Sequence, residues 1–406
     1  MGGWTKVYTS SSSFSFNDIP NLHGKVAIVT GSNTGIGYIT ALELAKNGAT
    51  VIVAARNIQR GQDAASKIQQ ELLLSNKSIN DSHEDDVDES CDATTTTTTT
   101  TIKERVQFLQ LDLGNLTSVK KFVDDFNLLN LGPALDILIN NAGIMKSPGA
   151  KFIGQNLTYG YSTTVDGFES HIGINHIGHF YLTHLLLDKL KMASTTTPGG
   201  GGGARVIQVA SSAEESAYDT IGFRFDEWHP GKNKNDDDGR PKMPIHYEDG
   251  NAYGQSKLAN ILFAKELATR MANSNVTAYS CHPGVIQTEL FKDLAAKGEE
   301  DKIKMNVFER RITEFFNKLF GLALMTPKQG ALTQLYLATT TTTATPSGDG
   351  KDDGRGVGVG LVNGGFYTPV GRLEQPKHPA YHNIDGISTK VWDETIKALQ
   401  AINIEI

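Results

Sequence analysis

A glycine-rich loop at residues 30–37, with the sequence TGSNTGIG, constrains the fold more than any other feature of the chain. It follows the apolar run at residues 25–30 and opens a helical pattern. Gly31 permits a tight turn, whereas Gly35 and Gly37 let the backbone approach a pyrophosphate bound at the helix N-terminus. The spacing is Gly-x3-Gly-x-Gly, not the general Gly-x-Gly-x-x-Gly. The order of strand, loop and helix predicts a nucleotide-binding site, with a plain glycine turn as the alternative.

Apolar runs alternate with helical patterns along the rest of the chain. The strand-like runs lie at residues 25–30, 51–54, 106–110, 135–139, 205–209 and 276–280. Continuous apolar strands separated by helices indicate a parallel sheet that is covered on both faces. The predicted fold class is α/β, a doubly wound parallel sheet (Rossmann fold), in which ligands bind outside the carboxyl ends of the strands.

Four segments lack the apolar periodicity needed to bury a face, and one of them contains eight consecutive threonines. We expect them to be disordered loop insertions. They lie near residues 76–104, 193–203, 231–246 and 339–358. About 330 residues remain, which is the size of one α/β domain. The predicted organisation is an N-terminal extension at residues 1–20 and a single domain at residues 21–406.

Charge and cysteine content exclude several classes of protein. The formal net charge of −7 over 406 residues argues against nucleic-acid binding, which needs a basic field. Two cysteines cannot form a disulfide scaffold, and no run of 18 apolar residues predicts a transmembrane helix. We expect a cytoplasmic protein.

The end of the second strand informs the choice of cofactor. An acidic residue there would bind the ribose 2′-hydroxyl of NAD, but the chain has Arg56 and no acid. Arg56 can bind the 2′-phosphate of NADP through charge-assisted hydrogen bonds, with a solvated surface arginine as the alternative. Asp112 and Leu113 follow the third strand and are candidates for the adenine pocket, although Asp112 could equally be a helix N-cap. The predicted cofactor is NADP(H).

Tyr253 and Lys257 are the strongest catalytic candidates. Of the twelve tyrosines, only Tyr253 has a lysine four residues later, which places both side chains on one helix face. Hydride transfer to or from a carbinol carbon requires a proton to move at the oxygen, and an unperturbed tyrosine has too high a pKa for this at neutral pH. The lysine ammonium would lower that pKa. Ser212, after the fifth strand, can hydrogen-bond the developing alkoxide.

In these motifs the chain resembles the short-chain dehydrogenase/reductase family, and most closely its retinol-dehydrogenase and WW-domain-oxidoreductase branch. The matching stretches are residues 30–37, 140–143, 166–169, 174–180, 253–262 and 282–285, within a region of about residues 22–338. The resemblance implies a seven-stranded doubly wound sheet. It also implies a catalytic tetrad of Asn175, Ser212, Tyr253 and Lys257, with Asn175 anchoring a relay water. Ser212 is chosen over Ser211 because the second of two serines usually has this role in the family.

By the same resemblance, Pro283, Ile286 and Thr288 flank the nicotinamide. The small residues after the fourth strand would let backbone lie against the cofactor. The complete set of predicted cofactor-binding residues is Gly31, Ser32, Asn33, Gly35, Ile36, Gly37, Arg56, Asp112, Leu113, Asn141, Ala142, Gly143, Tyr253, Lys257, Pro283, Ile286 and Thr288.

The implied activity is NADP-dependent interconversion of an alcohol and a carbonyl in a monomer or homodimer. The apolar stretch at residues 315–325 covers the substrate in the family and favours a retinoid, steroid or lipid aldehyde; a packed core helix and a weak contact with a membrane surface are the alternatives. The alternative functions are a catalytically silent NADP-binding interaction or sensor protein and a protochlorophyllide-type reductase.

Four histidines, His171, His176, His179 and His184, fall in one predicted helix. Their spacings do not place all four on one face, and no acidic partner is evident in the sequence. We therefore expect buried histidines with hydrogen-bond partners and no metal site.

Overall fold

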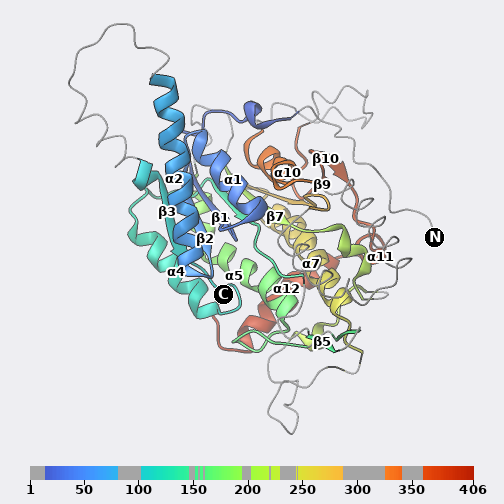
Figure 1. Cartoon of the computed structure of the whole chain (residues 1–406). Coiled ribbons are helices and arrows are strands. Elements are labelled where there is room, and N and C mark those ends of the chain that lie inside the picture. The colour runs from blue at the N-terminus through green and yellow to red at the C-terminus, as the bar shows by residue number, and fades with distance from the viewer. Residues whose placement is uncertain are drawn as a thin grey trace, which may run out of the picture.

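The computed structural model describes residues 14–80, 102–145, 151–153, 156–158, 161–193, 203–218, 221–228, 244, 246–286, 325–340 and 360–406. Its centre is an eight-stranded sheet in the order β10-β9-β8-β7-β4-β1-β2-β3 (Figure 1). The strands are β1 (Val26–Thr30), β2 (Thr50–Ala55), β3 (Val106–Gln110), β4 (Ile137–Asn140), β7 (Ala204–Val209), β8 (Val276–Cys281), β9 (Phe366–Thr368) and β10 (Arg372–Glu374).

Seven of these strands are parallel, and β10 pairs antiparallel with β9. The predicted α/β, doubly wound parallel sheet is confirmed, and the short edge strand β10 adds an eighth strand to the seven expected. A separate hairpin pairs β5 (Lys151–Ile153) with β6 (Asn156–Thr158).

Helices cover both faces of the sheet (Figure 1). Side chains alternate along β1, so that Val26 and Ile28 belong to one apolar cluster and Ala27 and Val29 to the other. The first cluster is completed by α4 (Leu116–Leu128), α5 (Gly178–Leu185), α7 (Asp249–Arg270) and α12 (Ile387–Gln400). The second is completed by α1 (Gly35–Lys46), α2 (Ile58–Asn80) and α10 (Pro327–Thr339).

The remaining helical segments are short. They are η1 (Phe16–Asp18), the π-helix η2 (Ile172–Ile177), α6 (Leu187–Lys191), η3 (Ser212–Ser216), η4 (Phe225–Glu227) and α11 (Pro379–Asn383). None of the helices among the described residues is both long and apolar enough to cross a membrane.

The first expected insertion is shorter than its predicted bounds of residues 76–104. Helix α2 continues to Asn80, and residues 102–105 are helical as well. The lack of apolar periodicity did not prevent α2 from extending, because a helix can add turns without an apolar face once its earlier turns pack on the sheet.

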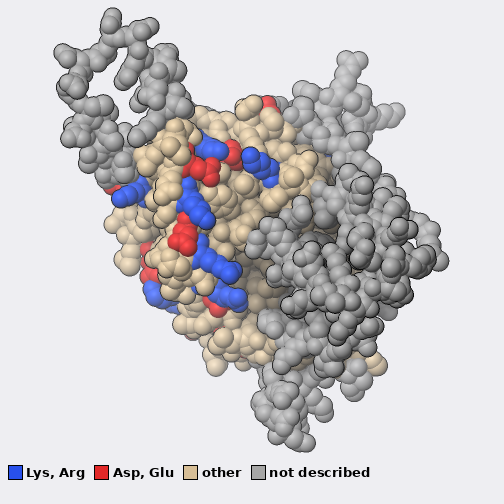
Figure 2. Space-filling view, viewed as in Figure 1, with Lys and Arg blue, Asp and Glu red and all other residues tan. Residues whose placement is uncertain are grey.

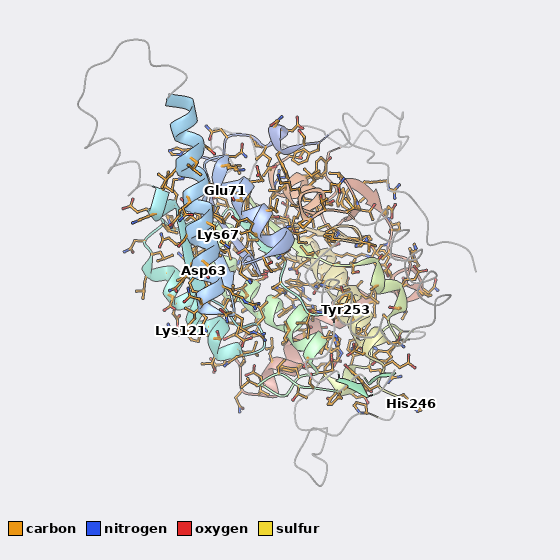
Figure 3. All side chains as sticks on the ribbon, viewed as in Figure 1. Asp63, Lys67, Glu71, Lys121, His246 and Tyr253 are labelled. Atoms are coloured by element: carbon orange, nitrogen blue, oxygen red, sulfur yellow. The ribbon has the colours of Figure 1, made fainter. Side chains whose placement is uncertain are left out.

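Charged side chains of both signs alternate over the described part of the face drawn in Figure 2. On α2, Asp63, Lys67 and Glu71 follow one another at four-residue spacing (Figure 3). On α4, Lys121 pairs with Asp125 at 2.7 Å. Exposed pairs of this kind contribute little to stability, and the described part of this face offers no field of a single sign.

Candidate active site

Hydrogen bonds to β1 and β2 fix the conformation of the glycine loop. Gly31 N donates to Ala54 O at 2.8 Å. The buried Ser32 hydroxyl donates to Val29 O at 2.6 Å and accepts from Ala54 N at 3.2 Å. Ser32, a predicted cofactor contact, therefore braces β1 against β2, while the partly exposed Asn33 lies on the loop above it.

Two glycines of the loop have left-handed backbone but different surroundings. Gly31 has a φ of 66°, and a Cβ there would lie 2.9 Å from Ala142 Cα. Gly35 has a φ of 60°, and a Cβ there would meet nothing within 4 Å. Gly35 thus begins α1 beside open space, which fits a phosphate group at a helix N-terminus.

The loop after β4 is fastened to the glycine loop through Thr30. Thr30 Oγ1 accepts from Asn141 N and Ala142 N, both at 2.9 Å, and Asn141 Nδ2 donates to Thr30 O at 2.7 Å. Asn141 Oδ1 is buried and has no hydrogen-bond partner within the described part of the chain. The open glycine turn and this oxygen fit the predicted dinucleotide.

Asn175 and Lys257 converge beside Gly143. Asn175, in the π-helix η2, donates from Nδ2 to Ile144 O and Ser256 Oγ, both at 2.9 Å, and accepts from Ile144 N at 2.8 Å. A Cβ on Gly143 would lie 3.2 Å from both Asn175 Oδ1 and Lys257 Nζ. Any side chain at residue 143 would therefore push these two groups away.

Tyr253 lies near Lys257 and interacts with the Ser211 side chain, next to the predicted Ser212, whose catalytic role stays a prediction. Lys257 Nζ lies 5.7 Å from the centre of the Tyr253 ring. Burial raises the pKa of Tyr253, and a hydrogen bond with the Ser211 side chain opposes that rise. Ser211 has extended backbone (φ −158°, ψ 155°) after β7, whereas Ser212 is already the first residue of η3. The turn into η3 therefore gives the two serines different surroundings.

Burial shifts the pKa values of Lys257 and Cys281, which lie close to each other in the site. Lys257 Nζ donates to Val209 O at 3.0 Å. Burial lowers the pKa of Lys257 to about 8, so the amine is mostly protonated at pH 7. Burial also raises the pKa of the Cys281 thiol to about 12, against the attraction of the Lys257 charge. Both shifts show a poorly solvated site at the carboxyl ends of β7 and β8.

Arg56, Asp112 and Leu113 lie where the sequence predicted them, after β2 and β3. Arg56 is exposed, and none of the described residues forms an ion pair with its guanidinium. The Asp112 carboxylate accepts from Gly114 N at 3.0 Å. The interpretation of Asp112 as a helix N-cap is wrong, because Asn115 caps α4 by accepting from Thr117 N and Ser118 N.

The loop after β8 approaches the start of α1. Pro283 and Ile286 are buried, and a Cβ on Gly330 would contact the side chains of both Ile286 and Ile36. Thr288 and residues 315–324 lie outside the described residues, so the predictions for them stay predictions.

The histidines take separate partners. His176 Nε2 is 2.8 Å from Thr395 Oγ1, and His179 Nε2 is 2.9 Å from Thr30 Oγ1. His171 Nδ1 lies 2.9 Å from Glu169 Oε1. This acidic partner was missed in the sequence, although it stands only two residues away. Nowhere in the described part do three or more His, Cys, Asp or Glu residues form a group that could hold a metal ion.

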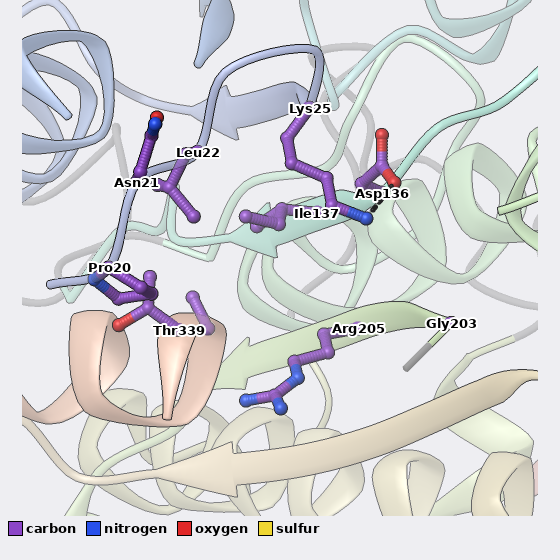
Figure 4. Close-up of a pocket in the computed structure, with 10 residues that line it drawn as sticks. Pro20, Asn21, Leu22, Lys25, Asp136, Ile137, Gly203, Arg205 and Thr339 are labelled. Atoms are coloured by element: carbon purple, nitrogen blue, oxygen red, sulfur yellow. Dashed lines mark hydrogen bonds and ion pairs between the residues drawn. The ribbon is translucent and has the colours of Figure 1, made fainter. Parts of the chain in front are cut away.

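A small cavity lies at the amino ends of the central strands, at the opposite end from Tyr253 and Lys257 (Figure 4). Its volume of about 30 Å³ suffices for about one water. It contains the buried ion pair of Lys25 and Asp136 at 2.9 Å. Arg205 donates to Leu337 O at 2.7 Å and so caps the end of α10. The candidate active site lies instead at the carboxyl ends of the strands, where such sheets bind ligands.

Comparisons with known proteins identify the family of the chain. The model of the short chain dehydrogenase family matches residues 25–84 and 78–222. Retinol dehydrogenase 11 of Mus musculus is 36% identical over 319 residues, which are 79% of this chain and 74% of the mouse protein. Retinol dehydrogenase 12 of Homo sapiens is 34% identical over 324 residues, 78% of this chain and 74% of the human protein.

A similar fold occurs in the crystal structure of an uncharacterised protein from Mycobacterium paratuberculosis. The two chains share 28% identity with a TM-score of 0.56, over 97% of this chain and 99% of the other. With the matches to the retinol dehydrogenases, the assignment is complete: this chain belongs to the short-chain dehydrogenase/reductase family, in its retinol dehydrogenase branch, and is an oxidoreductase that acts on CH–OH groups.

Proposed function

We propose that the protein is an NADP(H)-dependent oxidoreductase that interconverts an apolar alcohol and its carbonyl. The observation that carries the proposal is the meeting of Asn175, Ser211, Tyr253 and Lys257 near Gly143, whose loop is hydrogen-bonded to Thr30 at the start of the glycine loop. Relatives that are 34–36% identical carry the name retinol dehydrogenase, and retinol is an apolar alcohol. A retinoid, steroid or lipid aldehyde is therefore the proposed substrate class.

In the proposed reduction, bound NADPH would supply the hydride that the carbonyl carbon accepts. The Tyr253 hydroxyl gives its proton to the carbonyl oxygen, and the reverse transfer accompanies alcohol oxidation. Ser211 is the proposed hydrogen-bond donor to the same oxygen, because its side chain already contacts Tyr253. Lys257 provides the positive charge that favours ionised Tyr253. Asn175, held by Ile144 and Ser256, would anchor the water through which the proton is replaced.

The test is NADPH oxidation, followed by absorbance, with all-trans-retinal, medium-chain aldehydes, steroid ketones and aromatic ketones. Turnover in the dark that is lost in Tyr253→Phe is the expected result, and its dependence on substrate ranks the classes. NADPH binding without turnover of any compound would instead support a silent sensor protein. A requirement for light would favour the protochlorophyllide-type reductase.

The choice of NADP over NAD is tested at Arg56. Arg56→Glu should weaken NADPH binding by about 10- to 100-fold, since a charge-assisted contact to the 2′-phosphate is replaced by repulsion. NADH binding should change little. Lys67→Glu on α2 is the matched charge reversal at an exposed residue and should leave both affinities unchanged (Figure 3). Equal losses for NADPH and NADH in Arg56→Glu would contradict the assignment.

A further inference from the structure

A buried histidine packs against the proposed proton donor. The His171 ring lies 6.0 Å from the Tyr253 ring, centre to centre, at an interplanar angle of 67°. This edge-to-face arrangement joins the segment before η2 to the first turns of α7. The His171 side chain is fully buried. Tyr253 therefore has a titratable group beside it that the reaction described above does not use.

Glu169 holds His171 from one side. Its Oε1 lies 2.9 Å from His171 Nδ1 and accepts from the His171 backbone N at 2.9 Å. Its Oε2 accepts from Ile172 N at 2.9 Å, and the Tyr247 hydroxyl donates to Oε1 at 3.0 Å. Glu169 is itself 3% exposed. A carboxylate with this many donors is fixed in place, and it orients the imidazole.

Asp249 faces His171 from the other side. Asp249 Oδ1 lies 3.8 Å from His171 Nε2, and the Tyr247 hydroxyl lies 3.5 Å from the same oxygen. Asp249 is the first residue of α7, four residues before Tyr253. The imidazole thus stands between two buried carboxylates. Farther out, Glu227 pairs with Arg224; burial is the main cause that raises the pKa of Glu227, and the charge of Glu169 adds to it.

These neighbours favour a charged imidazole. Burial alone would lower the pKa of His171, but the hydrogen bond to Glu169, the charges of Glu169 and Asp249 and the backbone of Met145 raise it above its ordinary value. With His171 charged, one positive group balances part of the two negative ones. Without that charge, both carboxylates would oppose the ionisation of Tyr253.

We propose that His171 is a positioning residue for Tyr253: its ring fixes the tyrosine ring, and its positive charge offsets the buried carboxylates of Glu169 and Asp249 on either side of it. The proposal rests on the role of Tyr253 as the proton donor. It makes Glu169, His171 and Asp249 a unit that adjusts the acidity of the catalytic tyrosine.

The experiment replaces His171 with phenylalanine, which keeps a flat ring and removes the charge. The midpoint of the pH profile for NADP-dependent alcohol oxidation should move up by about one unit, because Tyr253 ionises less readily. The same rise should be seen in the ultraviolet titration of tyrosinate, taken as the difference between each protein and its Tyr253→Phe counterpart. This difference also separates Tyr253 from the titration of Lys257.

Two further variants separate charge from packing. His184→Phe, the same substitution at a half-buried residue of α5, should leave the midpoint unchanged. Glu169→Gln combined with His171→Phe should bring the midpoint back toward that of the parent protein, since one carboxylate is removed together with the imidazole.

An unchanged midpoint in folded His171→Phe would overturn the proposal. If that variant does not fold, His171→Gln is read in the same way and decides the question. The tyrosinate titration needs no turnover, so it tests His171 even if no compound in the substrate panel reacts. Absence of turnover in the parent protein would count against the proposed function alone.

Discussion

Ser211 and Ser212 are adjacent and chemically identical, yet they have different surroundings. Ser211 contacts Tyr253 and caps η3 by accepting from Ala213 N at 3.1 Å. Ser212 is the first residue of η3. Ser211→Ala should therefore lower kcat/KM by about 10²-fold or more, the usual loss when one donor to a developing oxyanion is removed. Ser212→Ala, the matched control, should stay within about threefold by the same measurement. A larger loss in Ser212→Ala would restore the original prediction.

The sequence predicts Tyr253 and Lys257 because residues four apart lie on the same face of any helix. It cannot choose between the two serines, since that choice depends on the residue at which β7 gives way to η3. Similarly, Asp249 reaches His171 only through the packing of α7 against η2. Glu169 did have a local signal, because its carboxylate accepts from the backbone N–H groups at the start of that helix.

At the scale of elements, two glycines of the glycine loop are needed for different reasons: Gly31 for packing against Ala142 and Gly35 for the space beside the start of α1. Alanine at residue 31 would collide with the backbone of Ala142, whereas alanine at residue 35 meets open space. Both have left-handed backbone, which costs an L-residue about 1 kcal/mol. Gly31→Ala should lower both Tm and NADPH affinity. Gly35→Ala should lower NADPH affinity by about tenfold or more, with a Tm decrease of only a few degrees. Equal NADPH affinity in Gly35→Ala and the parent protein would place the phosphates elsewhere.

The six strands predicted from apolar runs match β1, β2, β3, β4, β7 and β8 within two residues. These strands could be predicted because a strand that is buried on both faces of a sheet needs apolar residues at nearly every position. Strands β9 and β10 have three residues each and carry no comparable pattern. The π-helix η2 also escaped prediction, because a helical pattern of period 3.6 does not reveal where one extra residue enters a turn.

At the scale of the whole molecule, we propose that residues 94–101 are dispensable within a single domain over residues 21–406. The elements on either side already hold each other: Gln69 Nε2 of α2 donates to Val106 O of β3 at 2.7 Å, and β3 pairs with β2. Deletion of residues 94–101 should leave kcat/KM within about twofold, since loop length has a weak effect on closure entropy. Loss of the folded protein, measured by circular dichroism, would show that the segment is structural.

Buried neutral histidines should make the molecule sensitive to acid. Burial lowers the pKa of His176 to about 3 and those of His179 and His282 to about 4. In the unfolded chain these groups take up protons near pH 6.5, so their stabilisation is complete above about pH 6.5 and is lost as the pH falls toward 4. His171 acts in the opposite sense, because its pKa is raised: its contribution is complete below about pH 6.5 and is lost at higher pH.

Thermal unfolding monitored from pH 7.5 to pH 4.5 should therefore show a Tm decrease of at least about 5 °C. His176→Gln should reduce this decrease, since one of the three groups no longer titrates. A Tm that is constant over this range would contradict the inference that the three histidines are neutral in the folded protein.

The rate at which the buried Cys281 thiol is alkylated can report on opening of the central sheet. Its thiol is fully buried at the end of β8, and burial raises its pKa to about 12, so the thiol is protonated at neutral pH. Alkylating reagents attack thiolates, so they can modify this residue only during moments when the centre of the sheet opens. The rate at which the peptide containing Cys281 gains the label thus counts such openings. A ligand that covers the carboxyl ends of the strands beside Lys257 would stabilise the closed form and so slow this labelling.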